Sequence, residues 1–232
     1  MEWREAGEVR WLEARLPGAR AAFTSRTAGS LKESPELALT ALGLASAPVF
    51  GGRQVHGAEL AFDGSGEASG VPAEVDGQVI RSPGSAGLVY TADCLPIAVA
   101  GPAGVAILHC GWRGLAAGIV ARGVEAVGAT AAAIGPGIGP CCYEVGEDVL
   151  TALKVQPLSP TGLGRPYIGR NRPIGTVDLA EVARRQLRAA GVGEVEVAGL
   201  CTRCEGELFF SHRRDGGPGR QGGLVWLDGG GA

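Results

Sequence analysis

The chain has 232 residues, 45% of them hydrophobic and 19% charged, a composition that suits a soluble globular protein and excludes an intrinsically disordered one. Its net charge of −3 creates no basic field for nucleic acid or for an anionic membrane. A helix needs about 20 apolar residues to span a bilayer, and no apolar run in the sequence approaches this length. Because the N-terminus lacks a basic region followed by an apolar one, we expect no signal peptide and a cytoplasmic location.

The N-terminal part of the chain predicts two short strands and one weak helix. The strands are expected over residues 8–12 and 19–23, with a Leu-Pro-Gly turn between them. A loop of small residues follows and carries Arg26, and residues 35–42 predict the helix. Further along, residues 64–72 form a Gly/Ser-rich surface loop, and an Asp-Gly turn at 76–77 leads into a strand.

The central stretch, residues 90–114, contains two apolar, β-branched runs that meet at a Gly-Pro-Ala-Gly turn. This pattern predicts two buried strands joined by the turn. Cys94 and His109 lie at the edges of these runs, where strands give way to loops and rigid scaffolds commonly present functional side chains. His56, one of only three histidines, lies in a separate loop between glycines.

The second half of the chain mixes helices and strands without strict alternation. A helix over 115–128 is expected to begin just after Gly-Trp-Arg-Gly, where its free backbone N–H groups would face an anion. A strand at 131–134 and a short helix at 147–153 follow, and then a proline-rich loop at 156–175. Strands outnumber helices, so we expect an α+β fold: a single domain, residues 1–232, with mixed β-sheets flanked by helices.

Two further features are predicted near the C-terminus. Asp178 and Glu181 form a capping box that opens a helix through residue 187. A strand is expected at 195–200, and a final strand pair at 208–215 and 224–227 surrounds a Gly-rich loop that carries Arg220.

A metal site is the first of three groupings that compete as the source of chemistry. His56, Cys94 and His109 supply two imidazoles and one thiolate, a good ligand set for zinc, and three protein ligands leave the fourth position open to water. Zinc lowers the pKa of such a water to about 7. Their spacing matches no compact metal-binding signature, so the spacing alone is weak evidence.

A thiol hydrolase is the second grouping, in which Cys94 attacks a carbonyl and His109 acts as its base. Asp93, next to the cysteine, is a candidate to orient the imidazole, although neighbours on a strand point to opposite faces.

A structural zinc site is the third grouping, built from Cys201, Cys204 and the adjacent pair Cys141 and Cys142. We disfavour it because the chain has one Cys-x-x-Cys pair and adjacent cysteines seldom bind one ion together. Buried small apolar side chains are the preferred interpretation of Cys110, Cys141 and Cys142.

A series of motifs, in order and covering nearly the whole chain, resembles one known family. The motifs are Gln54-Val55-His56-Gly57, Thr91-Ala92-Asp93-Cys94-Leu95-Pro96, His109-Cys110-Gly111-Trp112-Arg113-Gly114, Ile134-Gly135-Pro136, Cys142-Tyr143-Glu144-Val145-Gly146, and Phe210-Ser211-His212-Arg213-Arg214-Asp215 with Gly219-Arg220. They are similar to those of the YfiH/laccase-domain family. This family was formerly described as multicopper polyphenol oxidases, and its members are now described as purine nucleoside phosphorylases or peptidoglycan-editing factors.

The resemblance implies a single α+β domain with Zn²⁺, or copper, held by His56, Cys94 and His109. It also implies phosphorolysis of adenosine, inosine, guanosine and methylthioadenosine, together with deamination of adenosine. The expected partners are therefore purine nucleosides and phosphate. Cys110 stands where the family usually has alanine, and the loop that carries Arg26 lacks the family's fuller Gly-Gly-Val-Ser run.

Arginines beside the motifs are candidates to hold phosphate, because a guanidinium fork matches phosphate oxygens. Arg113 is the preferred one, followed by Arg26, Arg214 and Arg220; the alternative is that each forms ion pairs that hold loops together. The competing functions are a Cys–His hydrolase acting on a peptide or amide, a polyphenol oxidase, and a zinc-stabilised binding protein without turnover. A laccase with three coppers needs many more histidines than three.

Overall fold

Two six-stranded sheets form the centre of the computed structural model, which describes residues 1–63, 73–158 and 174–229. The first sheet contains, in spatial order, β1 (Glu2–Ala6), β2 (Val9–Leu16), β3 (Ala19–Thr24), β14 (Gln221–Leu227), β7 (Ala86–Thr91) and β4 (Val49–Phe50). The second contains β13 (Glu194–Val197), β10 (Ala131–Ile134), β8 (Leu95–Gly101), β9 (Gly104–Cys110), β6 (Gly77–Ile80) and β5 (Leu60–Phe62). Both sheets are mixed, because β4 and β7, β10 and β13, and β5 and β6 pair in parallel and the other pairs are antiparallel.

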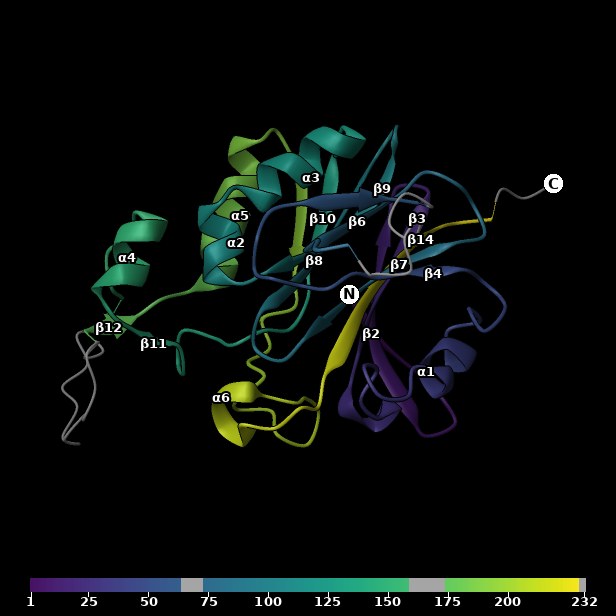
Figure 1. The fold of residues 1–232 in the computed structure, drawn as a ribbon, viewed down its shortest axis with the longest axis horizontal. Helices are drawn as coiled ribbons and strands as arrows, with labels where there is room; N and C mark the ends of the chain where they lie inside the picture. The colour runs from purple at the N-terminus through teal and green to yellow at the C-terminus, as the bar shows by residue number, and fades with distance from the viewer. Residues whose placement is uncertain (64–72, 159–173, 230–232) are drawn as a thin grey trace.

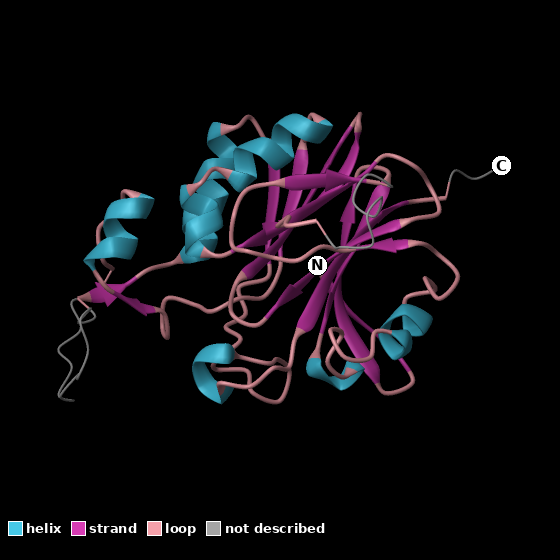
Figure 2. Cartoon of the chain, in the orientation of Figure 1, coloured by secondary structure: helices cyan, strands magenta, loops and turns pink. Residues whose placement is uncertain are grey.

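Helices cover the outer faces of the two sheets, so the fold has four layers (Figures 1 and 2). The helices α2 (Trp112–Ala116), α3 (Ile119–Val127) and α5 (Leu179–Ala189) pack with the second sheet around one apolar core. The helix α1 (Glu36–Ala41) and the 3-10 turn Arg26–Ala28 pack on the first sheet. The remaining described elements are α4 (Glu147–Leu153), α6 (His212–Asp215) and a small sheet of β11 (Glu144–Val145) and β12 (Gly175–Thr176). The predicted α+β class with mixed sheets is confirmed.

The hairpin of β8 and β9 is buried on both faces because it lies between the first sheet and the helices. Side chains alternate along a strand. Ile97 and Val99 therefore join the core under the helices, whereas Ala98 and Ala100 face the other sheet. This double burial explains why both strands are continuous apolar runs rather than alternating ones.

Several predicted elements are confirmed within one or two residues at their ends. They are β3, the central hairpin, β10, α4 and α5, whereas β2 begins near the expected residue 8 but continues to Leu16, four residues past its expected end. The carboxylate of Asp178 accepts the backbone N–H of Glu181 at 3.0 Å, as the capping box predicts.

Two predictions in the second half are wrong. The single helix expected over 115–128 is two helices, α2 and α3, because Gly118 adopts a left-handed conformation, φ 86°, between them. The first begins at Trp112, so the Gly-Trp-Arg-Gly motif belongs to the helix instead of preceding it.

The C-terminal strand pair is also corrected. Residues 208–211 are not a strand, and Ser211 caps α6 by accepting the backbone N–H of Arg214 at 3.1 Å. The strand β14 pairs instead with β3 and β7.

Some regions carry no structural statement. The Gly/Ser-rich loop at 64–72 and most of the proline-rich loop, 159–173, lie outside the described residues. Within the described part of the chain, no helix has both the length and the apolar character needed to cross a bilayer.

Candidate metal centre

The structure brings His56, Cys94 and His109 together, with one ligand atom from each lying within 4.8 Å of the others. His109 is in β9, Cys94 lies in the turn that enters β8, and His56 comes from the loop between β4 and β5. Because Pro96 pairs with His109 in the antiparallel ladder, the turn before β8 brings Cys94 beside the end of β9. The two imidazole rings meet edge to face, with their centroids 4.8 Å apart.

One buried carboxylate positions both histidines. Asp76 contacts Nδ1 of His109 at 2.7 Å and accepts the backbone N–H groups of Val55, His56 and Gly57 at 3.1, 3.0 and 2.7 Å. Burial favours the neutral acid, but the hydrogen bonds from His109 and Gly57 outweigh it and lower the pKa of Asp76. The ionised carboxylate therefore accepts the Nδ1 proton of His109, so Nε2 is the ring nitrogen that can bind a metal ion once it has lost its own proton.

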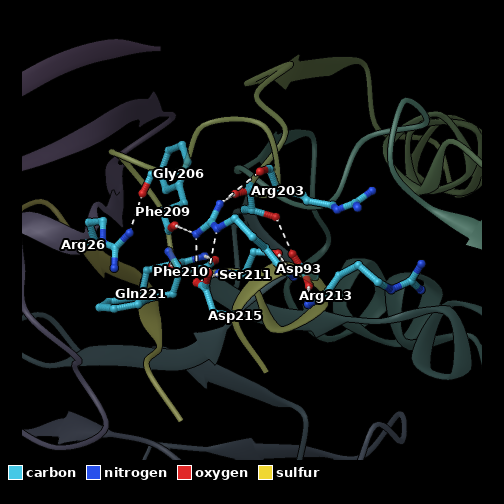
Figure 3. Close-up of polar contacts among 12 residues, drawn as sticks. Arg26, Asp93, Arg203, Gly206, Phe209, Phe210, Ser211, Arg213, Asp215 and Gln221 are labelled. Carbon is cyan, nitrogen blue, oxygen red and sulfur yellow. Dashed lines mark hydrogen bonds and ion pairs between the residues drawn. The ribbon is translucent and has the colours of Figure 1, made fainter. Parts of the chain in front are cut away.

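Sequence reasoning missed Asp76, and the candidate that it offered to orient the imidazole, Asp93, does not do so. The carboxylate of Asp93 accepts the hydroxyl of Thr202 and the backbone N–H of Arg213, each at 2.7 Å (Figure 3). Asp76 had been interpreted as part of an Asp-Gly turn. Only the pairing of β6 with β9, in which Gly77 lies opposite Leu108, brings it to His109.

The charges at the centre favour a thiolate. Burial opposes ionisation of Cys94, but the hydrogen bonds and charges of His109 and His56 outweigh it and lower the pKa of the thiol to about 6. Burial likewise opposes protonation of His109, yet Asp76 and Cys94 raise its pKa to about 9. The pKa of the neighbouring Cys110 is raised well above its ordinary value, mainly by burial, so this thiol stays neutral.

The residues present fit a single metal ion. Two imidazoles and a thiolate are ligands that Zn²⁺ and copper accept. A histidine ligand that donates its other ring N–H to a carboxylate is a recurrent feature of metal sites. A Cβ atom at Gly111 would lie 2.9 Å from Sγ of Cys94 and 3.3 Å from the His56 ring, so only glycine leaves this cluster its space.

A cavity of about 690 Å³ opens beside the three side chains. Its lining includes the basic residues Lys32, Arg53, Arg213 and Arg220, and the aromatic residues Tyr90 and Tyr143. Asp93 also lines it, but two hydrogen bonds already engage its carboxylate. The cavity therefore combines a candidate metal centre with walls that suit an anion.

Of the four predicted phosphate arginines, Arg220 lines this cavity. Its Nη1 donates to the carbonyls of Gly217 and Gly219 at 3.0 and 2.8 Å. Arg213, which was not among the four, also lines the cavity, and its guanidinium lies 5.4 Å from the centre of the Tyr143 ring.

The other three predicted arginines lie outside the lining of this cavity. Arg26 donates to the carbonyl of Gly206 at 2.5 Å and stacks on Phe210 (Figure 3). Arg113 is exposed, and its guanidinium lies over the Trp112 ring. Arg214 donates to three backbone carbonyls and pairs with Asp215, so it braces the loop at 202–209.

The four cysteines other than Cys94 and Cys110 are also brought together. One sulfur atom from each of Cys141, Cys142, Cys201 and Cys204 lies within 4.8 Å of the others. Cys110 and Cys142 are buried as predicted, but the prediction of a buried Cys141 is wrong, because that residue is exposed.

The fold consists of two mixed sheets flanked by helices, and its cluster of two histidines and one cysteine lies beside a basic cavity. These features define a protein with a candidate mononuclear metal site in a pocket of small-molecule size. The chain belongs to the family described as multi-copper polyphenol oxidoreductase laccase, whose family model matches residues 26–228.

Named relatives and a solved structure agree with this membership. A Xylella fastidiosa protein named purine nucleoside phosphorylase is 37% identical over 197 residues, covering 80% of this chain and 74% of its own. A Streptomyces coelicolor protein of the same name is 34% identical over 238 residues, covering 97% and 93%. A crystal structure of a Neisseria meningitidis protein superposes with a TM-score of 0.76 at 30% identity, covering 94% of this chain and 99% of that one.

Proposed function

We propose that the chain is a zinc-dependent purine nucleoside phosphorylase that cleaves adenosine, inosine, guanosine and methylthioadenosine with phosphate. The observation that carries the proposal is that the cluster of His56, Cys94 and His109 shares one cavity with basic and aromatic side chains. The names of the relatives from Xylella fastidiosa and Streptomyces coelicolor support it.

Phosphorolysis joins a phosphate oxygen to the anomeric carbon of the nucleoside while the bond to the purine nitrogen breaks. The purine leaves with the electron pair of that bond and takes up a proton. In the proposed site, the guanidinium groups of Arg213 and Arg220 hold phosphate. Burial, followed by the charge of Cys94, raises the pKa of Tyr143 to about 12, so its hydroxyl remains a hydrogen-bond donor to bound substrate.

The catalytic cluster proposed is His56, Cys94 and His109, which would hold the metal ion. A bound Zn²⁺ supplies Lewis-acid chemistry toward oxygen and nitrogen atoms of a substrate. Asp76 fixes the tautomer of His109, and the basic wall neutralises phosphate. We propose that the same site also deaminates adenosine, exchanging the amine of the purine for an oxygen from water and releasing ammonia.

The test is to incubate the metal-loaded protein with inosine, with and without phosphate, and to measure hypoxanthine and ribose 1-phosphate. We expect both products in equal amounts and only when phosphate is present. Release of hypoxanthine that ignores phosphate would contradict phosphorolysis. Incubation with adenosine tests the deaminase separately, because inosine and ammonia then appear without phosphate.

A Cys–His hydrolase is the second candidate, favoured by the alignment of Cys94, His109 and Asp76 and by the lowered pKa of the thiol. For this function, a chelator would leave turnover of an amide substrate intact, whereas alkylation of Cys94 would abolish it. For the phosphorylase, the chelator itself would abolish turnover of inosine, and added Zn²⁺ would restore it.

A further inference from the structure

Four cysteines from two distant segments meet beside the cavity, apart from the candidate centre at His56. Cys141 and Cys142 lie in the loop that follows β10, and Cys201 and Cys204 lie in the turn that follows β13. Sγ of Cys204 lies 3.6 Å from that of Cys141 and 3.4 Å from that of Cys142. All four sulfur atoms lie within 4.8 Å of one another.

These distances fit metal ligands better than disulfides. The sulfur atoms of a disulfide are about 2.05 Å apart. Thiolates that bind one tetrahedral Zn²⁺ at about 2.3 Å lie about 3.8 Å from one another. We propose that Cys141, Cys142, Cys201 and Cys204 bind one zinc ion in a structural site, with four protein ligands and no open position.

The backbone around the cluster suits thiolates. The N–H of Gly139 donates to Sγ of Cys201 at 3.2 Å, a hydrogen bond that favours the charged sulfur. Four thiolates around one Zn²⁺ carry a net charge of about −2. Arg214 donates to the carbonyls of Thr202 and Arg203, the two residues between the cysteines of the turn, so its guanidinium, which also pairs with Asp215, lies against this turn.

The adjacent cysteines contribute together because the loop turns tightly at this point. The N–H groups of Cys142 and Tyr143 both donate to the carbonyl of Gly139, at 2.9 and 3.0 Å. Cys141 is then exposed and Cys142 buried, yet both sulfur atoms reach Cys204. The ion would therefore lie near the surface, between the two segments.

The position of the cluster gives the ion a structural role for the cavity. The loop with Cys141 and Cys142 contributes Ile138 and Tyr143 to the cavity lining. The turn with Cys201 and Cys204 contains Thr202, which donates to Asp93 beside Cys94. One ion at the four sulfurs would tie together a wall of the cavity and the support of the loop that carries Cys94.

The first test is metal content. Protein purified without chelator is expected to hold about two zinc ions per chain, and the variants Cys94→Ala and Cys141→Ser/Cys204→Ser about one each. Cys110→Ala is the matched control, because Cys110 lies in the core outside both clusters and its loss should leave both ions in place. A single ion in the wild-type protein that disappears in Cys94→Ala would overturn the proposal. The zinc that remains in Cys94→Ala and is absent from Cys141→Ser/Cys204→Ser reports on the four cysteines alone, so it depends neither on nucleoside turnover nor on a metal at His56, Cys94 and His109.

The second test keeps the proposal falsifiable if the double variant does not fold. Cys141 and Cys204 are exposed, so free thiols at these positions would react quickly with a disulfide reagent. In folded Cys94→Ala protein we expect slow reaction, which becomes fast when a chelator removes zinc. Fast reaction before chelation would overturn the proposal, and so would a mass measured without reductant that shows a disulfide among the four cysteines.

Discussion

Asp76 and His109 form a buried carboxylate–imidazole pair with 2.7 Å between Oδ1 and Nδ1. The same carboxylate accepts the backbone N–H groups on both sides of His56 and that of His56 itself. Two of the three candidate ligands therefore take their positions from one side chain. This relationship makes Asp76 the most informative position at which to test the centre without removing a ligand.

We expect Asp76→Asn to weaken zinc binding by about 10- to 100-fold, because the partner that fixes the ligand tautomer of His109 is lost. The measurement is competition against a chelator of known affinity, with circular dichroism to verify the fold. Asp63→Asn is the matched control, since Asp63 also accepts backbone N–H groups, from Arg81 and Ser82, but lies outside the lining of the cavity. Equal zinc affinity in Asp76→Asn and the wild type would contradict this role.

Gly111→Ala should reduce the zinc content of the centre while the chain still folds. A Cβ atom there would lie 2.9 Å from Sγ of Cys94, whereas the backbone φ of −80° is acceptable for alanine. Gly51→Ala is the control, because its added Cβ meets only a carbonyl oxygen at 3.7 Å. Elemental analysis of both proteins decides the prediction, and undiminished zinc in Gly111→Ala would show that the cluster has more space than the structure gives it.

The metal-free protein should show an unusually acidic thiol at Cys94. Its pKa is lowered to about 6 despite burial, because His109 and His56 stabilise the thiolate. The thiolate is the reactive form, so the rate of alkylation of Cys94 should rise with pH with a midpoint near 6. Mass spectrometry of the peptide that contains Cys94 measures this rate. Replacing His109 by Gln should move the midpoint upward, and added Zn²⁺ should protect the thiol. A wild-type midpoint near the ordinary thiol value would refute this charge arrangement.

Arg220→Met should raise the KM for phosphate by about tenfold or more, because a hydrogen bond to a charged group contributes about 1.5–3 kcal/mol. Arg113→Met should change it much less, since Arg113 is exposed and lies outside the cavity lining. Initial rates with inosine at varied phosphate provide the comparison, and melting temperatures check the loop that Arg220 supports. A larger effect on this KM at Arg113 than at Arg220 would contradict the prediction and favour Arg113 as the residue that binds phosphate.

Local sequence signals were sufficient for much of the fold. The central hairpin and the capping box at Asp178 depend on residues close together in the chain, and both appear where expected. The break at Gly118 and the turn of helix at His212–Asp215 were missed. Both depend on backbone conformation at one or two residues, which the apolar pattern does not encode.

Long-range pairing explains what was missed at the site. The partner of His109 is Asp76, 33 residues away, and it is brought there by the pairing of β6 with β9. The convergence of the four cysteines spans 63 residues between Cys141 and Cys204. Residue type indicated candidate ligands, but only the sheet topology shows which of them meet.

The place of β14 in the first sheet has a consequence for how the chain is made. This strand, Gln221–Leu227, lies between β3 and β7, so among the described strands it alone joins the two halves of the sheet, and it leaves the ribosome after the other five strands of that sheet. Until then, β3 and β7 each present an unpaired edge, which is open to pairing with another nascent chain. Aggregation during synthesis should therefore be most sensitive to events that delay or remove this last strand.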